Sequence, residues 1–106
     1  MTKYNLKIKK GTDFVFDFRF RKTEDNSLVP LTGTSGTMNI DVDDVKYPGV
    51  VTIDDTLNVV RCKVARSITA TIPVGVGRYD IDLEMPNGDV LNIFSGDVEI
   101  LENVNV

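Results

Sequence analysis

The segment 78–101 constrains the fold of this 106-residue chain more than any other. Its first eight residues alternate between charged and apolar side chains, which is the pattern of a β-strand with one buried and one exposed face. The pair Asn87-Gly88 follows, and an Asn-Gly pair between alternating runs is a strong hairpin signal. An apolar-rich run over 90–101 then supplies the returning strand. The segment predicts an antiparallel hairpin, and we expect a type I′ turn with Gly88 at positive φ.

The register of this hairpin stays open at the level of the sequence. In one register, Tyr79 lies opposite Gly96, so that an aromatic ring covers a bare glycine, but Asn92 then points inward. A slip of one residue turns Leu91 and Ile93 inward instead. Both faces of the returning strand are partly apolar, so the alternation does not choose between the two registers.

Alternation also predicts strands in the rest of the chain. A stripe of phenylalanines shares one strand face: Phe14, Phe16, Phe18 and Phe20. We expect this stripe to anchor the core, because each buried Phe is worth about 1.5–3 kcal/mol. An exposed platform for stacking bases or sugars is the alternative. Further strands are expected at 4–8, 38–42, 50–53 and 57–64, with turns at 25–27 and 54–55.

This spacing of short strands and turns predicts an all-β fold, namely an immunoglobulin-like antiparallel β-sandwich of about seven or eight strands. A small closed barrel is the alternative. Residues 65–76 are ambiguous, and we expect at most one short helical turn near 66–72, which Ser67 could cap. The chain is expected to be a single domain over 1–106, with a flexible tail at 102–106 that could donate a strand to a neighbour.

Composition argues against several classes of function. The chain has no histidine, which removes the commonest general base and metal ligand, so we expect neither an enzyme nor a cofactor. A net charge of −4 argues against nucleic acid as a partner, and the lack of a long apolar run argues against a membrane. The N-terminus lacks the apolar region of a signal peptide. Cys62 is the only cysteine, so a reducing compartment is expected, and a buried structural thiol is favoured over a reactive one.

Charge is unevenly distributed along the chain. Residues 1–22 carry seven Lys and Arg against two Asp, a balance of +5, which leaves −9 on the remainder. Two differently charged faces of a sheet are the simplest interpretation, and copies packing basic face on acidic face are the sharper one. Three acidic clusters stand out: Asp41, Asp43 and Asp44, then Asp54 and Asp55, and then Asp80, Asp82 and Glu84. A calcium site or a glycosidase pair is conceivable there, but neither a calcium loop nor a cleft is indicated, and a solvated face is favoured.

Several phrases of the sequence together resemble a known family. These are Lys-Lys-Gly-Thr-Asp-Phe (9–14), Val-Pro-Leu-Thr-Gly (29–33), Val-Gly-Arg-Tyr-Asp-Ile-Asp-Leu-Glu-Met-Pro-Asn-Gly-Asp-Val-Leu (76–91) and Phe-Ser-Gly-Asp-Val-Glu-Ile (94–100). From Lys10 to Ile100 the chain resembles small β-sandwich virion proteins of tailed bacteriophages, and is similar to the immunoglobulin-like N-terminal domain of phage baseplate upper proteins. It departs from that pattern at Ile81, where a second aromatic residue is common.

The resemblance implies a structural, non-enzymatic subunit located in the virion and synthesised in the host cytoplasm. A tail or baseplate adaptor and a capsid decoration protein are the two placements, with other virion proteins and further copies of the chain as partners. The contact residues we expect are Lys3, Lys7, Lys9, Asp80, Asp82, Glu84, Val104 and Val106. A carbohydrate- or receptor-binding β-sandwich module is the alternative function, and a small inhibitor directed at the host stays open as well.

Overall fold

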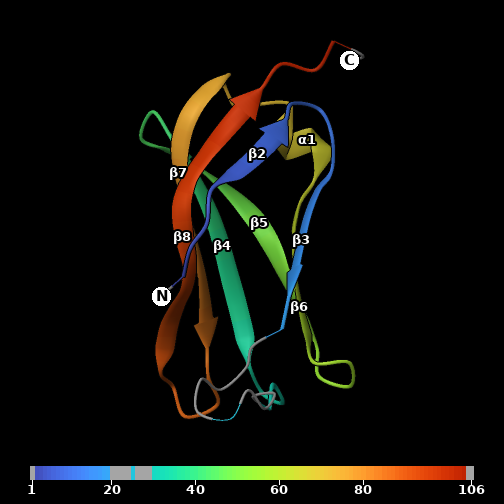
Figure 1. The fold of residues 1–106 in the computed structure, drawn as a ribbon, viewed down its shortest axis with the longest axis vertical. Coiled ribbons are helices and arrows are strands. Elements are labelled where there is room, and N and C mark those ends of the chain that lie inside the picture. The colour runs from blue at the N-terminus through green and yellow to red at the C-terminus, as the bar shows by residue number, and fades with distance from the viewer. Residues whose placement is uncertain (1, 20–24, 26–29, 105–106) are drawn as a thin grey trace.

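Two β-sheets joined by one long strand make up the fold in the computed structural model, which describes residues 2–19, 25 and 30–104 (Figure 1). The expected all-β sandwich is confirmed. The elements in chain order are β1 (Thr2–Lys3), β2 (Leu6–Lys9), β3 (Phe14–Phe18), β4 (Ser35–Val42), β5 (Val45–Asp54), β6 (Val59–Val64), α1 (Arg66–Thr69), β7 (Gly75–Glu84) and β8 (Val90–Leu101).

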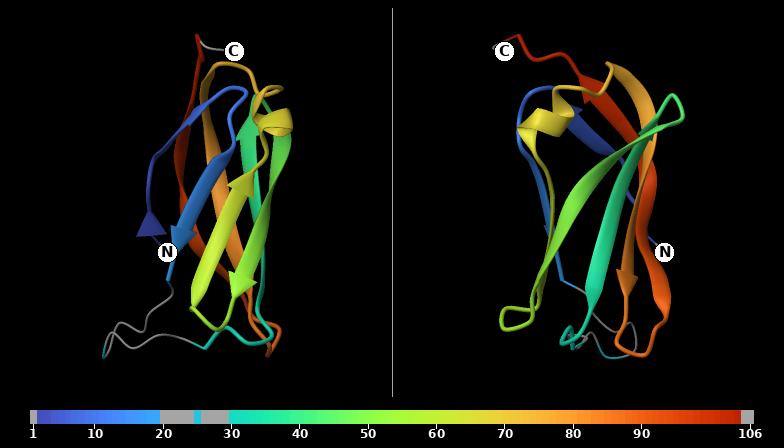
Figure 2. Two further views of the ribbon diagram at one scale, coloured as in Figure 1. Left: turned by 90° about the vertical axis from the view of Figure 1, so that its right-hand side faces the viewer. Right: turned by 180° about the vertical axis from the view of Figure 1, so that it is seen from behind.

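Strand β5 belongs to both sheets. Its first half, from Val45 to Gly49, pairs with β4 in sheet A, which also contains β7, β8, β1 and β2. Its second half pairs with β6 in sheet B, and β6 pairs in turn with β3 (Figure 2). Gly49 stands at the change of sheet, where an added Cβ would lie 3.0 Å from Met38 Sδ and 3.2 Å from the backbone oxygen of Lys63. The chain therefore turns the corner of the sandwich at a residue without a side chain.

The N-terminal strands depart from the expected antiparallel pairing. Both β1 and β2 run parallel to β8, in one continuous register from Thr2 opposite Phe94 to Lys9 opposite Leu101. The other strand pairs are antiparallel. Leu6 and Ile8 bury their side chains in this arrangement, while the lysines between them stay exposed. Alternation shows which face is buried but carries no information on strand direction, so the sequence could not reveal this pairing.

The hairpin of β7 and β8 uses both of the registers that the sequence left open. From Gly75 to Ile81 the first register holds, with Tyr79 opposite Gly96. From Asp82 to Glu84 the pairing is shifted by one residue. The shift leaves Ile93 as an extra residue on β8, which makes a β-bulge. The bulge lets an outward Asn92 and an inward Tyr79 belong to the same hairpin.

The turn of this hairpin differs from the expected type I′. The Gly88 N–H donates to the Met85 oxygen at 2.9 Å, and the Met85 N–H donates to the Asp89 oxygen at 2.8 Å. Gly88 has the expected positive φ of +92°, but Asn87 does not have one. The loop is therefore a three-residue connection that ends on a left-handed glycine.

A tight two-residue turn occurs instead at Asp43 and Asp44. Their φ angles are +53° and +64°, and the flanking Val42 and Val45 pair directly. Left-handed values at both central residues are the mark of the primed hairpin turn. These two aspartates connect β4 to β5 and do not lie on a strand.

The phenylalanine stripe contributes to the core from its border. The residues that the solvent barely reaches come mainly from β2, β4, β6, β7 and β8: Leu6, Ile8, Leu31, Met38, Ile40, Val42, Val60, Cys62, Val64, Ile72, Tyr79, Ile81, Leu83, Val98 and Ile100. Phe14, Phe16 and Phe18 are half-buried and pack against this cluster, while Phe20 lies outside the described residues. Because β3 has a described neighbour on one side only, its rings are covered less than those of a central strand.

The expected helical turn is confirmed as α1, but its cap is different. Ala65 occupies the N-cap position and offers no side-chain hydrogen bond. The Arg66 N–H instead donates to Oδ1 of Asp13 at 2.8 Å. A carboxylate from a distant loop therefore satisfies a free helix donor, and Ser67 lies inside the helix and not at its cap.

Candidate protein-contact surfaces

A buried tyrosine fixes the position of the N-terminal strand. The Tyr79 hydroxyl donates to the backbone oxygen of Tyr4 at 2.5 Å. That oxygen passes directly over Gly96, where an added Cβ would meet it at 2.4 Å. Burial is the main cause that raises the pKa of Tyr79 to about 12. A glycine is thus required at position 96 because the backbone of Tyr4 occupies the place of a side chain.

The predicted basic residues line the outer border of sheet A. Lys3, Lys7 and Lys9 are all exposed, and Leu6 and Ile8, which alternate with Lys7 and Lys9, point into the core. Lysines are common on edge strands, because a charged border hinders pairing with a strand of another chain. We call these three residues the lysine border.

The predicted acidic residues form a row along β7 on the outer face of sheet A. Asp80 and Glu84 are exposed, and Asp82 is half-buried. The Asn92 side chain donates from Nδ2 to Asp82 Oδ1 at 2.7 Å and to Asp80 Oδ1 at 3.3 Å. We call Asp80, Asp82 and Glu84 the acidic column.

The lysine border and the acidic column lie on the same face of one sheet. Lys3 pairs with Ser95 on β8, and Ser95 pairs with Asp80 on β7, so the three residues form one row across the sheet. The interpretation as two differently charged faces was therefore wrong. The strand order, which alternation does not encode, places a basic border beside an acidic centre.

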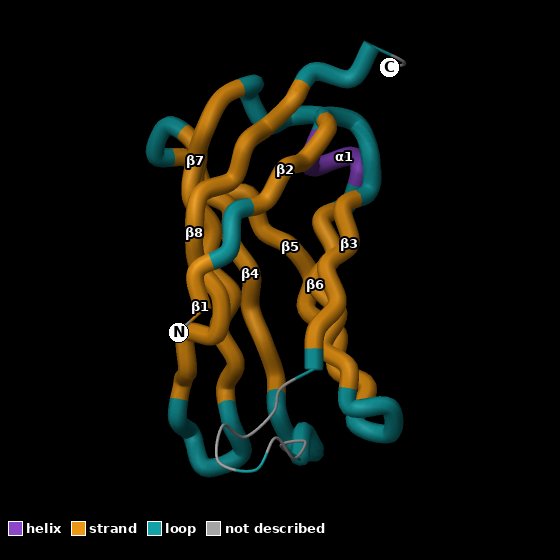
Figure 3. The backbone as a smooth tube through the Cα atoms, in the orientation of Figure 1, coloured by secondary structure: helices purple, strands orange, loops and turns teal. Residues whose placement is uncertain are grey.

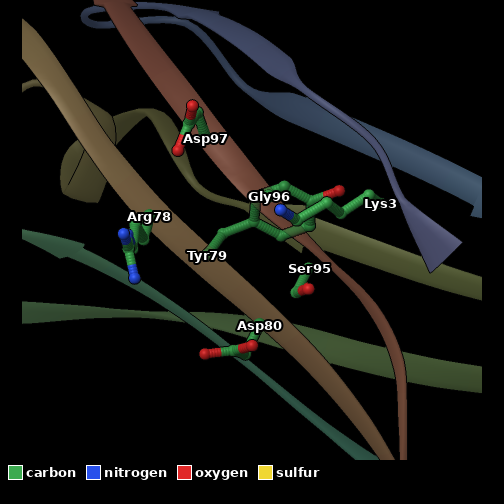
Figure 4. A pocket seen from close by; sticks show the side chains of 7 residues that line it. All are labelled: Lys3, Arg78, Tyr79, Asp80, Ser95, Gly96 and Asp97. Carbon is green, nitrogen blue, oxygen red and sulfur yellow. The ribbon is translucent and has the colours of Figure 1, made fainter. Parts of the chain in front are cut away.

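A shallow polar hollow of about 200 Å³ lies between the border and the column (Figure 4). It lies where β1, β7 and β8 run side by side on the outer face of sheet A. Figure 4 shows Arg78 and Asp97 on one side of this space and Asp80 and Ser95 on the other. The lining residues are Lys3, Arg78, Tyr79, Asp80, Ser95, Gly96 and Asp97.

The remaining predicted contact residues belong to the C-terminal tail. Val104 has 92% of its surface exposed. Val106 lies outside the described residues, as does the greater part of the turn expected at 25–27. Nothing in the fold brings Val104 into the charged face of sheet A.

Metal-ligating side chains are not grouped together in the described parts of the chain. No three His, Cys, Asp or Glu side chains there are placed to hold a metal ion. Cys62 is buried, and desolvation raises the pKa of its thiol to about 12, which confirms the structural reading of this residue. Over the same residues, no helix is long and apolar enough to cross a membrane.

One surface has no counterpart among the contact residues expected from the sequence, namely the edge of β3 that no described residue pairs with. Figure 3 shows β3 at the border of sheet B. The alternation that identified its phenylalanines also identified a strand, but the order of strands decides whether an edge is covered. One feature of the sequence could have indicated an edge open to pairing: β3 carries a single charged residue, Asp17.

Comparisons with solved structures return distant matches. InlP of Listeria monocytogenes matches at 12% identity and a TM-score of 0.49, covering 92% of this chain and 26% of that one. The extracellular domain of the voltage-gated sodium channel beta4 subunit matches at 7% identity and 0.49, covering 96% and 93%. A Listeria monocytogenes internalin-like protein matches at 14% and 0.43, covering 93% and 27%. The chain spans about a quarter of the length of the two Listeria proteins.

No curated protein matches the chain. A family model does, and it covers residues 2–101, which is nearly all of the sequence. The chain belongs to the LtfC-like β-sandwich domain family.

Proposed function

We propose that the chain is a non-enzymatic structural subunit of a bacteriophage virion, as a tail or baseplate adaptor or a capsid decoration protein. The charge arrangement on the outer face of sheet A carries this proposal, because the lysine border and the acidic column stand in fixed order on one surface. Ordered charges of both signs set the orientation of a partner. Membership of a phage-associated family supports the same role.

The charged face suits contact between copies in a symmetric assembly. Because the lysine border and the acidic column lie on one face, two copies can meet face to face, with each border against the acidic column of the other copy. Tyr79 and Gly96 hold the lysine border against β8, so a partner meets a preformed surface. Other virion proteins and further copies of the chain are the partners proposed for it.

Mass spectrometry of purified particles tests the location. The phage that encodes the chain should carry it at a fixed ratio to the major virion proteins. Particles that lack the chain would contradict the proposal, whatever the chain does in solution.

A complementation experiment tests the charged face. A phage deleted for the gene is supplied with Lys3→Gln/Lys7→Gln/Lys9→Gln, and incorporation into particles should fall about tenfold or more, since several charged contacts are lost together. The matched control is Lys46→Gln/Lys63→Gln, which neutralises two exposed lysines outside the border and should be incorporated like the wild type. Equal incorporation of both variants would remove the charged face from the assembly contact.

The polar hollow favours a second candidate, a carbohydrate- or receptor-binding module. A volume of about 200 Å³ lined by hydrogen-bond donors and acceptors suits a small polyhydroxylated group. A glycan array tests this candidate directly. Binding that is lost in Asp80→Ala would favour the module, and an array without binding would exclude it.

A further inference from the structure

Strand β3 offers a second surface, separate from the charged face of sheet A. Within the described ranges it is paired on one side only, by β6, in a register from Phe14 opposite Val64 to Phe18 opposite Val60. We propose that the other edge of β3 pairs antiparallel with β3 of a second copy, forming a two-fold dimer in which sheet B runs through both chains. This dimer does not depend on the proposed function.

The edge of β3 is unguarded. The border of sheet A carries lysines, whereas β3 has the sequence Phe-Val-Phe-Asp-Phe, without lysine or proline. Its single charge, on Asp17, is matched by Arg61, which donates from Nε and from its second terminal nitrogen, each at 2.9 Å. An edge with high β-propensity and no free charge is a template for another strand.

The inward face of β3 is incompletely covered. Phe14, Phe16 and Phe18 are half-buried, and the rings of Phe16 and Phe18 lie 5.2 Å and 4.7 Å from that of Phe94. Outside them, Val15 has 49% of its surface exposed. A strand added beside β3 would cover both the ring borders and this valine, which supplies the apolar burial that association needs.

One register of the dimer is selected by charge. With the two-fold axis through Phe16, Val15 of one copy faces Asp17 of the other, and Asp13 faces Arg19. Both Asp13 and Arg19 are exposed. Over residues 13–19, each dimer then contains two opposite-charge pairs and no like-charge pair, which is the favourable case for cross-strand neighbours.

The neighbouring registers are unfavourable. A shift of the pairing by two residues one way places Asp13 against Asp17 of the other copy, and a shift the other way places the two Asp17 residues against each other. A shift by one residue sets inward phenylalanines beside outward residues, which alternation forbids. The edge of β3 is therefore complementary to β3 of a second copy, and in one register only.

Sedimentation equilibrium of the purified chain is the first test. The 11.8 kDa chain should approach twice its mass as its concentration rises from about 10 μM to about 1 mM. A monomer throughout this range overturns the proposal. Larger, open-ended species also overturn it, because a two-fold edge contact closes after two copies.

Charge variants test the register. Arg19→Asp turns both ion pairs into like-charge contacts and should raise the dimer dissociation constant about tenfold or more. The matched control is Lys63→Asp, which makes the same charge change on β6, one strand away from the edge, and should dimerise like the wild type. Equal effects of the two variants would overturn the pairing through β3.

Restoration in a mixture completes the test. Asp13→Lys should also fail to dimerise with itself, but mixed with Arg19→Asp it regains both ion pairs and should form a heterodimer. A mixture of Asp13→Lys with Lys63→Asp has the same total charge as the first mixture, but it does not restore both ion pairs and should not form a heterodimer. Asp13 also caps α1, so circular dichroism checks the fold of that variant, and the Arg19→Asp result stands without it.

Discussion

Two buried weak acids make the folded chain sensitive to alkali. Burial raises the pKa of Cys62 from 9.0 and that of Tyr79 from 10.0, each to about 12. Since both pKa values are higher in the folded chain, their contribution to stability is complete below about pH 9 and is lost as the pH rises towards 12. We expect the urea midpoint to fall between about pH 7 and about pH 10.5, more steeply than the exposed groups alone would cause.

Tyr79→Phe is the variant that isolates one of these groups. It removes the hydrogen bond to the Tyr4 oxygen and should cost about 1 kcal/mol of unfolding free energy at neutral pH, but its loss in alkali should be smaller than that of the wild type. Tyr47→Phe, at a half-buried tyrosine on β5, is the control and should keep the alkaline loss of the wild type. An unchanged alkaline loss in Tyr79→Phe would show that the phenol is not held neutral by the fold.

Among the elements, the β7–β8 hairpin shows what alternation can and cannot predict. Both strands could be predicted from the sequence, and the pairing of Tyr79 with Gly96 belongs to one of the two registers that the sequence left open. The bulge at Ile93 could not, because the two registers buried similar apolar groups. The turn type could have been predicted from Pro86, because the fixed negative φ of proline suits the first central position of a type I turn.

Gly88 tests the turn. Its φ of +92° is unfavourable for a side chain, yet an added Cβ would have no atom within 4 Å, so the cost of substitution is a backbone cost alone. Gly88→Val should lower the unfolding free energy by about 1–3 kcal/mol, whereas Gly88→Asn should cost less, because asparagine tolerates left-handed values. Urea titration of both variants measures the difference. Equal losses of unfolding free energy in the two variants would contradict a purely backbone cost at Gly88.

On the scale of the whole molecule, the order and direction of the strands could not be predicted from the sequence. The lysines and carboxylates were identified as contact residues from their strands alone, but their common face follows from the parallel placement of β1 and β2 beside β8. The free edge of β3 follows from the change of sheet within β5. Contacts between residues far apart in the chain fix both features, and local alternation is silent about them.

Because β5 is shared, the two sheets should unfold together, and Gly49 is the residue that tests this coupling. Gly49→Val would press on Met38 and on the Lys63 backbone, one in each sheet, and should lower stability by about 1–3 kcal/mol. Hydrogen exchange followed by mass spectrometry should show equal loss of protection in β3–β6 and in β7–β8. Val50→Thr, at a neighbouring residue that is 65% exposed, is the control and should be near neutral. Loss confined to one sheet would mean that β5 links two units that open separately.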